Sequence, residues 1–201
     1  MVPPFLCDTA GMTTQLKIAI LAVGLLFAAV VFCQYPTAPP SATAIGGNAQ
    51  LDFPEHFREW VYLSSGFDMS YRPAMTMDHH MFDNVFVNPE AYRAFVETGT
   101  WPDKTMLVLE AREAEGKGSI NQRGNYQGAR LGIEVHVKDA ARFPGKWAFY
   151  AFEDGKTGKL VPTSADCYSC HAQHGAVDTT FVQFYPTLMP IAKRKGTVAS
   201  H

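Results

Sequence analysis

The stretch LGIEVHV, residues 131–137, alternates apolar and polar side chains with the two-residue period of a β-strand. Its leucine, isoleucine and valines would share one face, which we expect to be buried in a core. Glu134 and His136 would lie on the other face, together with Gly132. That face is either exposed to solvent or turned into a ligand cavity, where Glu134 would act as a proton carrier or a hydrogen-bond acceptor. Periodicity alone does not decide between the two.

Three further runs have the composition of strands, because they are rich in β-branched and aromatic residues. They are NVFV at 84–87, TMLVLEA at 105–111 and KWAFYAF at 146–152. Combined with the helices described next, these runs predict an α+β fold, mainly an antiparallel β-sheet with a few helices.

Two segments have the periodicity of amphipathic helices. In NPEAYRAFVETG, residues 88–99, Asn88 is a preferred N-cap, Pro89 fits the first turn and Gly99 closes the helix. In PEHFREWVYLSSG, residues 54–66, aromatic and aliphatic side chains fall on one helical face. We therefore expect a first helix at 54–66 and a second at 88–99.

The length and charge of the chain restrict its class. With 201 residues it is long enough for one ordinary domain and a short appendage. Its 17 Lys and Arg residues nearly balance 19 Asp and Glu residues, for a formal charge of −2, and no long run of one sign occurs. Nucleic-acid binding is therefore not expected.

The N-terminus reads as a targeting segment. Residues 18–33 are uncharged and mostly apolar, Lys17 precedes them, and SATA at 41–44 has the small-residue pattern of a cleavage site. Met12 is the better start codon. We expect export to the periplasm, with the leader either cleaved as a signal peptide or kept as a membrane anchor. The chain would then comprise a leader (1–44), a linker (45–50) and one folded domain (51–201).

The motif CYSCH at 167–171 carries the chemistry. Because Cys7 and Cys33 lie in the leader, the exported domain keeps only Cys167 and Cys170. A structural zinc site would need a separated second pair of ligands, and a redox dithiol would need a preceding strand in a βαβ unit, so both are disfavoured. A CxxCH motif suits covalent haem c, in which both thiols add to the haem vinyl groups and His171 becomes the proximal iron ligand.

The motif is expected on a short C-terminal helix. Thr163 and Asp166 have the spacing of a capping box at its start, and Gly175 marks its end. His174 lies four residues after Cys170 and shares its face, so it is either a second ligand or a histidine exposed beside the haem propionates.

Several stretches together resemble the cytochrome P-460 family, which includes the β-sheet cytochromes c-prime. They are FREWVYLSSG, NVFVNPEAYRAFVETGTWPD, VKDAARFPGKWAFYAF and CYSCHAQHGAVDTTFVQFYPTL, and they extend from about Phe57 to about Leu188. The resemblance implies an antiparallel sheet with a few helices, a homodimer, and one c-type haem with an open distal face. Its haem-binding residues correspond to Cys167, Cys170 and His171.

The sequence departs from the hydroxylamine-oxidising members of that family. Their lysine that cross-links to the haem corresponds to Leu109, and their distal arginine corresponds to Asp83, whereas their strand glutamate is kept as Glu134. Leucine has no nitrogen for such a bond. Lys104 is an odd number of residues from 109 and would face the other side of a regular strand. Lys117 is the other lysine nearby.

Three functions follow from these observations. The favoured one is a five-coordinate haem that binds nitric oxide or a related small N-oxide. The second is an electron carrier with a periplasmic redox partner, which would need a sixth ligand such as methionine. The third is hydroxylamine oxidation with Glu134 as the base. Candidate sixth ligands or packing residues are Met69, Met75, Met77, Met81, His79 and His80; Arg123 and Arg130 are candidate propionate partners.

Overall fold

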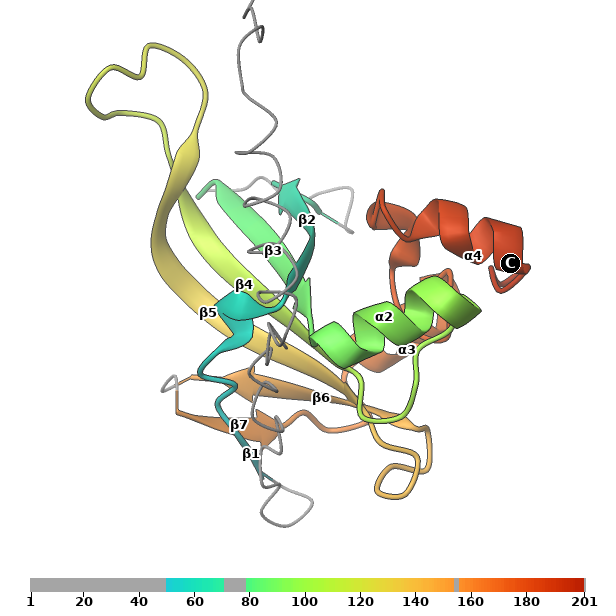
Figure 1. Ribbon diagram of the computed structural model, residues 1–201. Helices are drawn as coiled ribbons and strands as arrows, with labels where there is room; N and C mark the ends of the chain where they lie inside the picture. The colour runs from blue at the N-terminus through green and yellow to red at the C-terminus, as the bar shows by residue number, and fades with distance from the viewer. Residues whose placement is uncertain (1–49, 71–78, 154–155, 201) are drawn as a thin grey trace, which may run out of the picture. The chain divides into compact units, whose positions relative to one another are not determined.

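A computed structural model describes residues 50–70, 79–153 and 156–200. In them, seven strands form one antiparallel sheet in the order β1-β7-β6-β5-β4-β3-β2 (Figure 1). The strands are β1 Gln50–Asp52, β2 Val61–Phe67, β3 Met81–Val87, β4 Met106–Glu115, β5 Tyr126–Lys138, β6 Trp147–Phe152 and β7 Thr157–Leu160. The helices are α2 Pro89–Thr98, α3 Asp166–His174 and α4 Met189–Lys195, with 3-10 turns η1 Phe57–Glu59 and η2 Val182–Phe184. The predicted α+β fold is confirmed.

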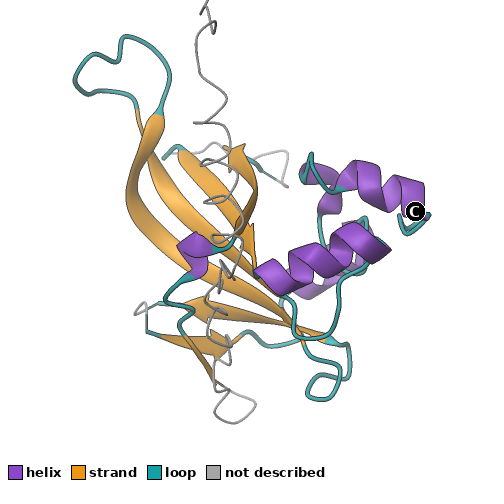
Figure 2. Cartoon of the chain, viewed as in Figure 1, coloured by secondary structure: helices purple, strands orange, loops and turns teal. Residues whose placement is uncertain are grey.

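Each face of the sheet has its own apolar core. On one face, α2, α3 and α4 lie together, and Phe95, Trp101 and Leu188 are fully or almost fully buried there (Figure 2). On the other face, η1 and β1 supply Phe57 and Leu51, both fully buried. The sheet is therefore covered on both sides, and helices are concentrated on one of them.

The prediction of a helix at 54–66 is wrong. Only η1 is helical, and the chain then extends as β2, where Val61 is paired with Val87 of β3. Val61 and Tyr62 are good strand formers, and pairing with a neighbouring strand outweighs a weak helical periodicity. A β-bulge at Leu63 interrupts the ladder, because Tyr62 and Ser64 pair with consecutive residues of β3.

The second expected helix is confirmed as α2, with a different role for its cap. The Asn88 side chain makes no bond to the helix; its oxygen accepts a hydrogen bond of 2.8 Å from the Met106 N–H. This contact ties the helix start to β4. At the other end Gly99 has φ of 78° and donates its N–H to the Phe95 carbonyl at 2.7 Å. The left-handed conformation explains the glycine.

Among the described residues, no helix has both the length and the apolar character needed to span a membrane.

Candidate functional site

Helix α3 carries the CxxCH motif. It starts at Asp166, with Ala165 rather than Thr163 as its N-cap, so the expected capping box does not form. It ends at Gly175, whose N–H donates to the His171 carbonyl at 2.9 Å. Residues three apart on a helix lie on neighbouring positions of one face, which brings Cys167 and Cys170 together. Both are free, partly buried thiols.

The imidazole of His171 is held in one orientation. Its Nδ1 lies 2.7 Å from the Thr179 carbonyl oxygen. Because a carbonyl can only accept, Nδ1 carries the proton and Nε2 keeps a free lone pair. Burial lowers the pKa of His171, although the Thr179 carbonyl acts in the opposite direction. A neutral imidazole with one nitrogen bound to a backbone carbonyl is the arrangement typical of an iron-ligating histidine.

Three aromatic rings surround this imidazole. The ring centroids of Phe181, Phe149 and His136 lie 4.2, 4.7 and 5.2 Å from that of His171. They come from the segment after α3 and from strands β6 and β5. The histidine is therefore fixed by packing as well as by its hydrogen bond.

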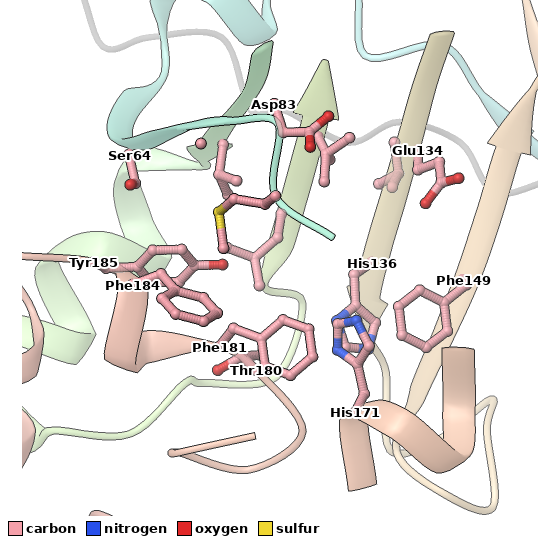
Figure 3. Close-up of a pocket in the computed structure, with 16 residues that line it drawn as sticks. Ser64, Asp83, Glu134, His136, Phe149, His171, Thr180, Phe181, Phe184 and Tyr185 are labelled. Carbon is pink, nitrogen blue, oxygen red and sulfur yellow. The ribbon is translucent and has the colours of Figure 1, made fainter. Parts of the chain in front are cut away.

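A cavity lies beside His171, between the sheet and the C-terminal segment (Figure 3). Its volume is about 210 Å³, and about 950 Å³ when the space open to solvent at its mouth is counted. The walls are formed by Ser64, Gly66, Met69, Asp83, Val85, Leu107, Leu109, Glu134, Val135, His136, Phe149, His171, Thr180, Phe181, Phe184 and Tyr185. Most of these side chains are apolar or aromatic.

The sheet contributes to this cavity in regular rows across the strands. The first row contains Leu107, His136 and Phe149, and it contacts His171. The second row contains Ser64, Val85, Leu109 and Glu134, and the third contains Gly66 and Asp83. Strand residues two apart are separated by about 7 Å along the strand, so the rows are spaced by about that distance.

Two carboxylic acids lie in the cavity wall. Glu134 has a raised pKa because nearby protein displaces water from it and because Asp83 is close. The pKa of Asp83 is raised by burial and by the charge of Asp68. The Glu134 side chain lines the cavity and is also exposed to solvent. The polar face of LGIEVHV therefore borders a cavity at Glu134 and His136, and Glu134 remains open to water as well.

His136 adds an unusual group to the same wall. It is only 7% exposed, its ring stacks on Phe149 at 3.9 Å, and its Nε2 has no partner among the described residues. Burial, with a smaller effect from His171, holds its pKa well below the usual value. It is therefore a neutral imidazole, and either an ordered water or a bound ligand would satisfy its buried nitrogen.

The methionine-rich segment is only partly described. Met69 lines the cavity, with its sulfur close to the Gly66 backbone. Met81 begins β3, and His79 and His80 are exposed and do not line the cavity. Met75 and Met77 lie outside the described residues. The one methionine placed at the cavity is thus Met69, within the part of the segment that is described.

The basic candidates lie away from the cavity. Lys104 is paired with Asp139 before β4, and Lys117 lies in the exposed β4–β5 connection. Arg130 stacks over Phe53 at 5.8 Å, Arg123 lies in the β4–β5 connection and His174 is exposed. None of these side chains is among the described residues that line the cavity.

The sequence did not single out several cavity residues. Phe149 lay in a predicted strand, and its alternation with Trp147 could have placed it on the cavity face. Phe181, Phe184 and Tyr185 follow the motif at irregular spacing, and no local signal distinguishes them from ordinary core residues. The Thr179 carbonyl is a backbone group and leaves no trace in the sequence.

A cavity between an antiparallel sheet and a CxxCH helix, with a histidine of fixed tautomer in its wall, defines the class of haem-binding cytochromes. A family model described as cytochrome P460 matches residues 54–182, well over half of the chain. The chain therefore belongs to the cytochrome P460 family, as the resemblance predicted, and is a haem-binding cytochrome. A search of curated proteins found no match.

Proposed function

We propose that this protein holds one covalent haem c, attached through Cys167 and Cys170, with His171 as the proximal iron ligand. The observation that carries the proposal is the hydrogen bond from Nδ1 of His171 to the Thr179 carbonyl, 2.7 Å long. It leaves Nε2 unprotonated for the iron. The two thiols lie one helical turn apart on the same helix, which suits attachment to two vinyl groups of one porphyrin.

The ligand that we propose for the iron is nitric oxide or a related small N-oxide. Haem iron with an open position supplies reversible binding of such molecules and electron transfer to or from them. The protein provides apolar walls from Leu107, Leu109 and Val85, which favour a small, weakly polar ligand. The aromatic side chains of Phe181 and Phe184 also line the cavity.

Leu109 supports a haem without a lysine cross-link. It is paired with Val85 and Glu134 on the neighbouring strands and lines the cavity. No lysine is among the described lining residues. A bond between protein and porphyrin needs an amine within covalent reach, and a leucine side chain can only pack there.

Two observations support the alternative functions of electron transfer and hydroxylamine oxidation. Met69 in the cavity wall could supply a sixth ligand, which would favour an electron carrier with a periplasmic redox partner. Glu134 with its raised pKa could accept a proton, which would favour hydroxylamine oxidation. Export to the periplasm and a homodimer belong to the same proposal, on the basis of the apolar leader and the family resemblance.

Absorption spectra of the purified holoprotein separate these functions. We expect a high-spin ferrous haem that binds carbon monoxide and nitric oxide. A low-spin ferrous haem that is inert to carbon monoxide would favour the electron carrier. Mass spectrometry of the haem-bearing tryptic peptide is the second measurement, because a haem that joins the CYSCH peptide to a lysine peptide would favour the hydroxylamine oxidase.

A further inference from the structure

The charged groups in the cavity wall are all of one sign. Among the described lining residues, Asp83 and Glu134 are acidic, and there is no arginine or lysine. Neither acid forms an ion pair with another described residue. The Asp68 carboxylate, close enough to act on Asp83, is itself paired with His80. A ligand that enters this cavity therefore meets two acidic groups whose charge no lining cation offsets.

Glu134 and Asp83 lie one and two strand rows away from the row that contacts His171. Figure 3 shows Asp83 and Glu134 on the sheet at one end of the cavity and His171 at the other. The row of Glu134 follows the row that contacts His171, at a spacing of about 7 Å, and the row of Asp83 follows next. His136, whose Nε2 has no partner among the described residues, belongs to the row that contacts His171.

The two acids already repel each other. Asp83 is one cause of the raised pKa of Glu134, and a second negative neighbour, Asp68, raises the pKa of Asp83 in turn. In both cases burial is the larger cause. A third negative charge in the same cavity would be subject to the same repulsion.

We propose that Asp83 and Glu134 make this cavity selective for neutral N-oxide ligands, such as nitric oxide and hydroxylamine, and exclude anionic ones, such as nitrite. This inference rests on the proposed function, because it concerns ligands of the same iron. At an effective dielectric constant of about 20, a unit charge one row away (about 7 Å) weakens binding of an anion by a factor of tens, and one two rows away (about 14 Å) by a factor of several. Because Glu134 is exposed, solvent reduces its effect towards the lower figure. A neutral ligand has no such penalty. The cavity thereby discriminates by charge between molecules of nearly equal size.

The test compares an anion with a neutral ligand on the ferric holoprotein. The probes are azide and imidazole, titrated at about pH 8, where free carboxylic acids are ionised. The variants are Asp83→Asn, Glu134→Gln and the double variant. The control is Glu113→Gln, because Glu113 lies on β4, is exposed and does not line the cavity. We expect each cavity variant to bind azide roughly severalfold more tightly, with imidazole affinity unchanged and no effect of the control.

A second measurement needs no substitution. Salt screens charge repulsion, so azide affinity of the unmodified protein should rise with ionic strength, and this rise should be smaller in the double variant. The inference would be overturned if the substitutions raised the affinities for azide and imidazole equally. It would also be overturned if azide affinity changed neither with the substitutions nor with ionic strength.

Carbon monoxide binding to the ferrous protein separates a failure of the charge selectivity from a failure of the proposed open iron position. If carbon monoxide binds and the acid substitutions leave azide affinity unchanged, only the charge selectivity fails. If carbon monoxide does not bind, the open iron position fails, and the selectivity that depends on it fails as well.

Discussion

The two faces of the central sheet differ in whether their carboxylates are paired with cations. On the face away from the cavity, Glu110 of β4 is 3% exposed and is paired with Arg58 and Arg112, the latter at 3.0 Å. On the cavity face, Asp83 and Glu134 have no cationic partner among the described residues. Glu110 is next to Leu109, whose cross-strand partner is Glu134. Adjacent positions of one ladder thus serve two purposes: a compensated charge stabilises the fold, and uncompensated charges remain available to a ligand.

The largest expected effect concerns the haem itself. Cys167→Ala combined with Cys170→Ala should abolish covalent haem, because no other cysteine is present in the described residues. A denaturing gel stained for haem peroxidase activity should show a band for the unmodified protein and none for the variant. A colourless band from the unmodified protein, produced in a host that matures c-type cytochromes, would contradict the covalent attachment.

The second largest effect tests directly whether carboxylates on the two faces differ in their contribution to stability. Glu110→Gln should lower the free energy of unfolding by about 2–3 kcal/mol, because it leaves two arginines without their carboxylate. The effect is smaller than for a fully buried pair, since the Arg58 side chain is 52% exposed. Glu134→Gln is the matched control and should change stability by less than about 1 kcal/mol. Urea denaturation of both holoproteins measures the difference, and equal losses would refute it.

A smaller effect concerns acid stability at Asp139. Burial would raise the pKa of this side chain, but Lys104 and the N–H groups of Ala141 and Arg142 outweigh burial and hold the pKa below its usual value. Its stabilising contribution is therefore present above about pH 4 and is lost as the pH falls through the folded-state pKa. Asp139→Asn should cost about 1–2 kcal/mol at neutral pH and less in acid. Denaturation at several pH values checks the sign; a cost that grows in acid would contradict it.

The smallest expected effect is the pH dependence of stability that Asp83 and Glu134 cause on the cavity face. Because the pKa values of Asp83 and Glu134 are raised, their contribution to stability is largest below about pH 4 and is lost as the pH rises through the folded-state values. The double variant Asp83→Asn, Glu134→Gln should lack this loss, which we expect to be below about 1 kcal/mol after solvent screening. Its stability should therefore fall less than that of the unmodified protein between about pH 4 and pH 7. An identical pH profile for both proteins would contradict this.

The sequence predicts the elements of this fold better than it predicts their assembly. Alternation in 131–137 correctly placed Ile133, Val135 and Val137 in the core, although Leu131 is 47% exposed. Pro89 and Gly99 correctly bounded α2, although the Asn88 side chain does not cap it. The segment 54–66 was misread because its partner strand lies about twenty residues further along the chain. The motif helix was expected, although its start at Asp166 depends on context rather than on a capping residue.

The cavity depends on register, which a single strand does not specify. Asp83 and Glu134 belong to β3 and β5, which do not pair with each other and meet only through β4. A shift of one residue on either side would turn one acid to the opposite face. The hydrogen bond of His171 could not be foreseen, because its acceptor is a backbone carbonyl in an irregular segment.

The bulge in β2 has a consequence for insertions and deletions. Leu63 is the extra residue there: it is 2% exposed in the core, yet it occupies no rung of the ladder between Tyr62 and Ser64. Loss of this one codon would remove a core side chain but would leave both flanks of the strand in frame, with Ser64 and Gly66 still toward the cavity. Loss of Ser65 would instead turn every later residue of β2 to the opposite face of the sheet, or shift the register of β2 against β3. At Leu63, β2 can therefore change in length without losing its register.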